Sequence, residues 1–255
     1  MKHISSRDNP FYKRLHRLID GKRAGEAVLE GVHLCQEWLR HKGLPQAALF
    51  DSSKLASGGE LAELARALPE SSCISCEPAL VRGLSQVGHG QGVYFLVGVP
   101  ELSPPARIAE NCLWLDRVQD PGNLGTLLRT AAAAGIAHAY LSTGCASAWA
   151  PKVLRSAQGA HFAMAVYEHL DLAQLRQRLD VPLLATALQG GEPLYDAVLP
   201  QRCAWLIGNE GQGVEPSLLD LADMRVFIPQ EQGVESLNAA VAAAICLFEQ
   251  RRRCI

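Results

Sequence analysis

Apolar residues in the first part of the chain recur with the spacing of short helices and strands. Tyr12, Leu15, Leu18 and Ile19 form a helical stripe between charged residues, which predicts a basic amphipathic helix over residues 9–20. The same pattern predicts further helices at 31–41 and 60–68, one or two helical turns at 79–84, a strand at 47–50 and an apolar run at 93–97. A small N-terminal α/β domain is therefore expected.

A stretch with three prolines at 99–107 interrupts this pattern and predicts a linker. Beyond it, short apolar runs alternate with helical patterns. The predicted strands lie at 112–115, 137–142, 183–187, 203–207 and 225–228. Such alternation is typical of an α/β domain with a parallel sheet and helices on both faces. We expect one domain at 1–98 and a second at 108–255.

The composition is that of a globular protein, because 48% of the 255 residues are hydrophobic. The longest apolar stretch, 239–248, is too short to span a bilayer, and no apolar signal core follows the basic N-terminus. Scattered cysteines favour reduced thiols in the cytoplasm. Cys73 and Cys76 form a C-x-x-C pair without further ligands nearby, so no metal is expected.

Net charge is −2 over the chain, but residues 1–23 hold seven basic and two acidic residues. This local excess is a candidate phosphate-binding patch, with Lys13, Arg14 and Arg17 as the expected RNA contacts. A solvated helix face would give the same pattern, and the two readings carry equal weight.

Three loops at predicted strand ends join glycine to polar side chains. The first, L-D-R-V-Q-D-P-G-N-L-G-T-L-L-R-T at 115–130, places Asn123 as the expected N-cap of a helix and Arg129 away from its buried face. The second, A-W-L-I-G-N-E-G-Q-G-V at 204–214, runs from a strand into a glycine-rich loop containing Glu210. Its G-x-x-G-x-G spacing differs from the dinucleotide fingerprint, which argues against a nicotinamide-dependent oxidoreductase.

The third loop, within 226–245, leads from a strand through a proline into an alanine-rich helix. Leu237, Val241, Ala244 and Phe248 give this helix its expected apolar stripe. Ser236 and Asn238 lie at its first turn, where helix capping alone would explain them.

In this order, D-P-x-N-x-G-x-x-x-R, L-I-G-x-E-x-x-G and I-P-x-x-x-x-x-x-S-L-N closely resemble the SpoU/TrmH family of the SPOUT class of RNA methyltransferases. The resemblance covers about residues 110–253. Residues 1–98, with N-P-F-Y-K-R-L and L-E-G-V-H-L, look like the small substrate-binding domain that many ribosomal-RNA members carry.

This resemblance implies a C-terminal trefoil knot that binds S-adenosylmethionine, a homodimer, and methyl transfer to a ribose 2′-hydroxyl of RNA, above all large-subunit ribosomal RNA. Transfer RNA as substrate, or a non-catalytic RNA-binding protein with this fold, are the alternatives. By motif position, the cofactor contacts fall on Gly208, Ile228 and Leu237. The matching catalytic positions are Asn123, Arg129, Glu210, Ser236 and Asn238.

The family commonly assigns the proton acceptor to the arginine that corresponds to Arg129. An arginine is protonated at neutral pH, so we expect Arg129 instead to bind an RNA phosphate and stabilise the developing alkoxide. Glu210 is expected to hold Arg129, and Asn123 to orient the ribose.

Overall fold

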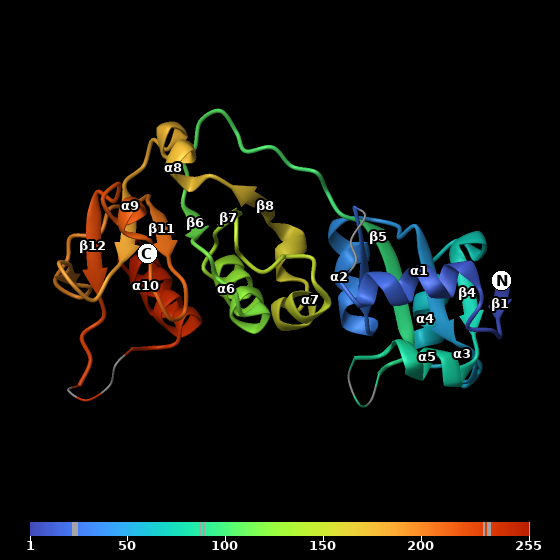
Figure 1. Cartoon of the computed structure of the whole chain (residues 1–255). Coiled ribbons are helices and arrows are strands. Elements are labelled where there is room, and N and C mark those ends of the chain that lie inside the picture. Colours follow the sequence, from blue (N-terminus) through green and yellow to red (C-terminus); the bar gives the residue numbers. More distant parts are fainter. Residues whose placement is uncertain (22–24, 87, 89, 232, 234–235, 255) are drawn as a thin grey trace. The chain divides into compact units, whose positions relative to one another are not determined.

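The computed structural model describes the chain except residues 22–24, 87, 89, 232, 234–235 and 255 (Figure 1). It forms two compact units. One comprises Met1–Glu101 together with Trp149–Phe162, and the other comprises Leu102–Ala148 together with Ala163–Ile255. Across the described ranges, no helix combines the length and apolar character needed to cross a membrane.

The first unit is built on a mixed sheet, which has five strands among the described residues. Their order is β1 (Lys2–Ile4), β4 (Cys73–Cys76), β3 (Ala47–Asp51), β5 (Val93–Gly98) and β2 (Glu26–Glu30), with β5 antiparallel to both neighbours. Its helices are α1 (Pro10–Ile19), α2 (Val32–His41), α3 (Ser52–Ala56), α4 (Glu60–Arg66), α5 (Pro78–Leu84) and the 3-10 turn η1 (Glu70–Ser72). The expected N-terminal α/β fold is confirmed, although β1, β2 and β4 were not predicted.

Helix α1 follows the predicted pattern closely. Tyr12, Leu15, Leu18 and Ile19 are its buried residues, as expected from their spacing. Asn9 caps the helix, because its side-chain oxygen accepts hydrogen bonds from the N–H groups of the second and third helical residues. The charged residues of α1 are consequently left on the solvent side.

A segment from the second half of the chain belongs to this first unit. Helix α7 (Pro151–Ala157) and the 3-10 turn η2 (Ala160–Ala163) follow one another there, and α7 packs against β2. Trp38 of α2 meets Trp149 and Phe162 edge-on, with ring centroids 6.2 and 5.3 Å apart. Aromatic burial of this kind contributes strongly to packing, so the segment is part of the first unit's core.

The second unit contains the expected parallel sheet, with seven strands in the described part of the chain. Their order is β10 (Glu192–Pro193), β12 (Met224–Phe227), β9 (Leu183–Thr186), β11 (Ala204–Ile207), β6 (Cys112–Leu115), β7 (His138–Ser142) and β8 (Ala165–Leu170). Neighbouring strands pair in parallel throughout. Of these strands, β8 and β10 were not predicted.

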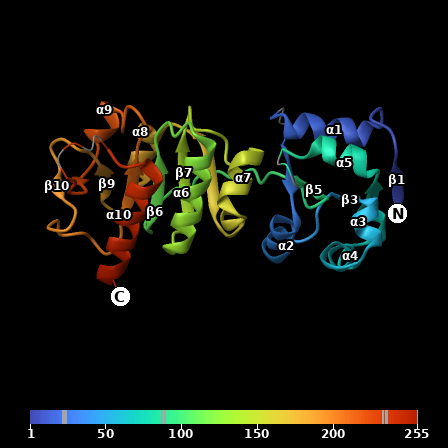
Figure 2. The same cartoon turned by 90° about the horizontal axis from the view of Figure 1, so that it is seen from below.

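Helices cover both faces of this sheet (Figure 2). Helix α6 (Pro121–Ala133) packs against α10 (Ala239–Cys254), and Trp205 of β11 donates to Gln250 of α10 at 2.8 Å. The neighbouring positions on β11 face the opposite way, into a core with residues of α8 (Leu172–Leu175) and α9 (Pro216–Leu219). The 3-10 turn η3 (Arg176–Arg178) follows α8. This confirms the predicted architecture, whereas the trefoil knot stays a prediction.

The expected apolar stripe of the last helix is wrong for a single chain. Val241 and Phe248 are 49% and 45% exposed. The buried face instead consists of Ala240, Ala243, Cys246, Leu247 and Gln250. Alanine lies on nearly every side of α10, so hydropathy alone does not identify the inward face.

Candidate functional site

Helix α6 begins one turn earlier than its sequence suggested. Asp120, not Asn123, is the N-cap, and its side chain accepts from the N–H of Asn123 at 2.8 Å. The expectation that Asn123 caps the helix was therefore wrong. Pro121 takes the first helical position, which its missing N–H and fixed φ favour. Asn123 is thus inside the first turn, where its own side chain remains available for other contacts.

The side chain of Asn123 joins all three motif loops. Its Nδ2 donates to Glu210 Oε1 at 3.2 Å, and its Oδ1 accepts from Asn238 Nδ2 at 2.9 Å. Asn238 also caps α10, because its Oδ1 accepts from the N–H groups of Ala240 and Val241. The capping explanation for Asn238 is correct, and the same side chain also extends the hydrogen-bonded chain Asn238–Asn123–Glu210.

Glu210 is held as an ionised carboxylate. Burial alone would raise its pKa, but hydrogen bonds from its own N–H, from Asn123 and from the N–H groups of Asp120 and Gln119 outweigh burial, so the pKa is lowered. A carboxylate with a lowered pKa is a poor proton acceptor near neutral pH. Its contacts make Glu210 an anchor between the first and second motif loops.

A buried carboxylate, Asp116, holds the end of the glycine-rich loop through hydrogen bonds. It is 1% exposed, accepts from the N–H of Glu215 at 2.9 Å and forms an ion pair with Arg117. Arg117 has a φ of +51° and donates through Nη1 to Gln212 in the same loop at 3.2 Å. A positive φ costs energy for an arginine, so the surrounding contacts must compensate for it.

The glycine-rich loop also folds tightly on itself. Asn209 Oδ1 accepts from the N–H groups of Gly211 and Gln212, both at 3.0 Å, while its Nδ2 donates to the carbonyl of Arg117 at 2.8 Å. A Cβ atom added to Gly208 would lie 2.1 Å from backbone atoms of Gly213 and Val214. Position 208 therefore requires glycine.

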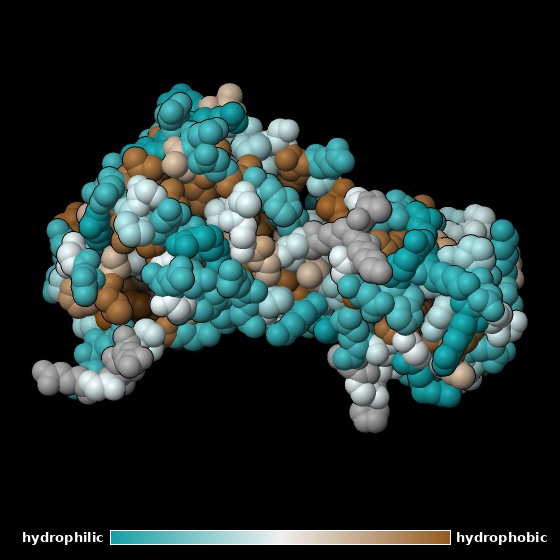
Figure 3. Space-filling view, in the orientation of Figure 1, coloured by the Kyte–Doolittle hydropathy of each residue, from teal (hydrophilic) through white to brown (hydrophobic). Residues whose placement is uncertain are grey.

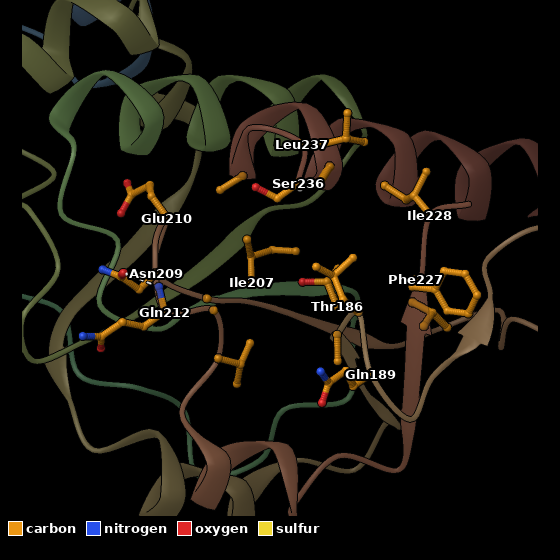
Figure 4. A pocket seen from close by; sticks show the side chains of 18 of the residues that line it. Thr186, Gln189, Ile207, Asn209, Glu210, Gln212, Phe227, Ile228, Ser236 and Leu237 are labelled. Carbon is orange, nitrogen blue, oxygen red and sulfur yellow. Dashed lines mark hydrogen bonds between the residues drawn. The ribbon is translucent and has the colours of Figure 1, made fainter. Parts of the chain in front are cut away.

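A cavity of about 380 Å³ opens between these loops (Figure 4). Its walls include Thr186, Ile207, Val214, Phe227 and Gln230, and the predicted residues Gly208, Glu210, Ile228, Ser236 and Leu237. Asn123, Arg129 and Asn238 are not among its lining residues. The mixture of apolar walls, backbone groups and a few polar side chains suits a ligand such as a nucleoside derivative.

The SpoU rRNA Methylase family model matches residues 110–248. The chain belongs to this family. It is 34% identical to the 23S rRNA (guanosine(2553)-2′-O)-methyltransferase RlmP of Bacillus subtilis, over 98% of this chain and 100% of that protein.

Two solved structures share the fold of this SpoU family member. One is the AdoMet-bound rRNA methyltransferase from Sinorhizobium meliloti, with a TM-score of 0.84 and 26% identity over 100% of this chain and 98% of that one. The other is the SpoU methyltransferase AviRb from Streptomyces viridochromogenes in complex with AdoMet, with a TM-score of 0.84 and 25% identity over 96% and 98%. AdoMet is S-adenosylmethionine.

Arg129 of this SpoU family member is exposed on α6. In the described part of the chain, no hydrogen bond or ion pair to its guanidinium is formed. The expected contact between Glu210 and Arg129 is absent there, since Glu210 is engaged by Asn123 and two backbone N–H groups. Arg129 is thus a free cation, as its position off the buried helix face suggested.

The expected RNA contacts on α1 have different surroundings. Lys13 pairs with Asp8 at 2.8 Å, and Arg14 forms a two-pronged ion pair with Glu26. Arg17 is exposed, and no described residue pairs with it. Lys22 and Arg23, also counted in the basic stretch, lie outside the described residues.

Sequence reasoning missed several polar residues of the site. Asn209 and Gln212 stand inside the second motif, where their positions between glycines were a usable signal. Asp116 and Arg117 precede the first motif's proline in the same loop. Gln230 gave no such signal, although it lines the cavity and its buried Oε1 has no hydrogen-bond partner in the described chain.

Proposed function

We propose that this protein transfers a methyl group from S-adenosylmethionine to a ribose 2′-hydroxyl of ribosomal RNA. One observation carries the proposal: a side chain from each motif loop meets in the chain Asn238–Asn123–Glu210, beside a cavity that Glu210 also lines. The relative RlmP acts on a guanosine of 23S rRNA, which favours a large-subunit guanosine over transfer RNA as the target.

The cavity residues fit S-adenosylmethionine. Gly208 lets the glycine-rich loop close on itself at the cavity wall, and Ile228 and Leu237 supply apolar walls. The unpartnered Oε1 of Gln230 is an acceptor for an amino group of the cofactor. A volume of about 380 Å³ falls within the usual range for small-ligand pockets, about 300–1,000 Å³. Bound there, the cofactor would supply an electrophilic methyl group.

The polar residues then have separate tasks. Arg129 binds an RNA phosphate and stabilises negative charge as it develops on the ribose oxygen. Glu210 and Asn238 fix Asn123, which orients the ribose, while Ser236 at the cavity wall contacts the reacting groups. The low pKa of Glu210 argues against a role as proton acceptor.

We further propose that a second copy of the chain covers the exposed stripe of α10, which consists of Val241 and Phe248. Val241 and Phe248 are about half exposed and lie seven residues apart, on one side of the helix. Apolar surface of this kind favours a partner of matching shape. We therefore expect a homodimer, acting in the cytoplasm, in which the first unit holds the RNA.

The test is methylation of RNA fragments with radiolabelled S-adenosylmethionine, followed by mapping of ribose methylation in a deletion strain. We expect a single missing 2′-O-methyl group in large-subunit ribosomal RNA. If the missing 2′-O-methyl group is found in transfer RNA instead, the substrate is transfer RNA and not ribosomal RNA. Cofactor binding with no missing mark in any RNA would favour the non-catalytic alternative.

A further inference from the structure

The first unit contains a hollow of about 770 Å³ beside α1 that none of the three motifs accounts for. Its lining includes Arg7, Tyr12, Lys13, His16, Arg17 and Gly83. Figure 3 shows that the surface over α1 is mainly hydrophilic. A concave site with several cations is suited to an anion larger than a simple inorganic ion.

The charges in this hollow are only partly compensated. Among the described residues, none pairs with Arg7 or Arg17, and both side chains are exposed. Lys13 pairs with Asp8 at 2.8 Å, but both partners are solvent-exposed, and such pairs contribute little to stability. Lys13 can therefore exchange Asp8 for a ligand phosphate, and three cations face one carboxylate.

Arg14 is different although it lies on the same helix. Its guanidinium holds Glu26 through two hydrogen bonds, and it does not line the hollow. The N–H groups at the start of α1 are also engaged, because Asn9 accepts from two of them. The anion-binding groups of this region are thus the side chains of Arg7, Lys13 and Arg17.

The floor of the hollow contains a buried, hydrogen-bonded tyrosine. Tyr12 is 4% exposed and its hydroxyl donates to the carbonyl of Leu80 at 3.0 Å. Gly83 lies next to it, and a Cβ there would approach the Tyr12 hydroxyl to 3.0 Å. Burial raises the pKa of Tyr12, and the positive charge of Arg7, which lines the same hollow, opposes this shift.

We propose that this hollow binds one nucleotide of the RNA substrate through its phosphate, with Arg7 and Arg17 as the main contacts. The proposal rests on RNA being the substrate. Within the basic stretch at residues 1–23, Arg7 and Arg17 then contact RNA, and Arg14 does not.

The test compares Arg7→Ala/Arg17→Ala with Arg14→Ala in binding of ribosomal-RNA fragments at several salt concentrations. Each lost phosphate contact lowers the salt slope by about 0.7 for single strands and about 0.9 for duplexes. Because Arg7 and Arg17 hold the same phosphate, we expect the double variant to lower the slope by about 0.7–0.9. Arg14→Ala should leave it unchanged. Lysine at positions 7 and 17 should restore most of the slope, because counterion release depends on charge.

Cofactor affinity serves as a control and should be unchanged in all three variants. The melting temperature should be unchanged in the two variants at positions 7 and 17, whereas Arg14→Ala should melt lower because the partly buried Glu26 loses its partner. An unchanged slope in the double variant, or an equal decrease in Arg14→Ala, would overturn the proposal. Failure of the function proposed above is recognised separately, because the wild-type protein would then not methylate RNA.

Discussion

Arg129 carries a positive charge that no described residue neutralises, while Glu210 carries a negative charge that several donors satisfy. The two residues stand in adjacent motifs, and their signs suggest an ion pair. The structure instead uses Glu210 to bind loops together and leaves Arg129 free for a charge supplied from outside. Single-residue roles in this site are therefore separable by mutation.

Replacing Arg129 by alanine should slow single-turnover methylation by roughly 10²–10³-fold, the usual effect of removing one preorganised electrostatic donor. Stability should change by no more than about 0.5 kcal/mol, since the side chain is exposed. Arg129→Lys should remain severely impaired because it loses the two-pronged phosphate grip. Arg202→Ala, at another exposed arginine outside the cavity, is the matched control. A normal rate in Arg129→Ala would eliminate this role.

Gly208 offers an equally sharp test of the cavity. Gly208→Ala would place a Cβ 2.1 Å from backbone atoms of the returning loop, so we expect loss of cofactor binding and a stability loss of about 3 kcal/mol or more. Gly211→Ala, in the same loop, would bring its Cβ no closer than 3.7 Å to Asn209 Oδ1 and should be tolerated. Calorimetry and urea unfolding measure both effects. Similar behaviour of the two variants would contradict the steric argument.

Among the strands, those with uniformly apolar sequences were predictable, whereas very short strands and strands with exposed residues were not. The strands around residues 112–115 and 203–207 are fully buried, so their sequences are uniformly apolar. Strand β10 has two residues, and β1 exposes two of its three, so neither carries a periodic signal. Motif residues around the cavity were predictable from their resemblance, whereas Gln230 depends on how distant loops meet.

The Cys73–Cys76 pair lies on a strand, and this decides where the two thiols point. Both residues lie on β4, three positions apart, and are buried. Side chains alternate along a strand, so the two thiols point to opposite faces. Burial raises the pKa of Cys76 to about 11, which disfavours the thiolate that a metal needs.

The buried histidine of η2, His161, predicts that the free energy of unfolding depends on pH. His161 is 1% exposed, and neither ring nitrogen has a partner among the described residues. Burial, reinforced by the charge of Lys42, lowers its pKa from 6.5 to about 3. The unfolded chain therefore binds a proton below pH 6.5 that the folded chain does not, and stability falls between pH 6.5 and 3.

His161→Phe should remove this dependence while keeping the aromatic packing. Relative to the variant, the wild type should lose about 2 kcal/mol of unfolding free energy between pH 7 and pH 5, because one pKa unit corresponds to about 1.4 kcal/mol. Urea unfolding at the two pH values measures this difference. Parallel pH profiles for the two proteins would show that His161 titrates normally in the fold.

In the whole molecule, the first compact unit is not continuous in sequence, because it includes a segment from the second half of the chain. Residues 149–162 follow the first motif in sequence but pack with Trp38 in the first unit. A fragment starting at residue 108 would leave Trp149 and Phe162 without Trp38. Experiments on assembly therefore require the full chain, because aromatic surface exposed by truncation would itself promote association.

The homodimer is the property of the whole molecule that the exposed stripe on α10 predicts. Val241→Glu/Phe248→Glu introduces charges at two half-exposed positions, so the fold of one chain should be little affected, whereas a dry interface would have to bury unpaired carboxylates. We expect sedimentation at micromolar concentration to show a dimer for the wild type and a monomer for this variant. Leu44→Glu, at an exposed apolar residue of the first unit, should remain dimeric. A wild-type monomer would refute the homodimer, and a dimeric double variant would move the interface to another surface, since two buried carboxylates would not be tolerated on this one.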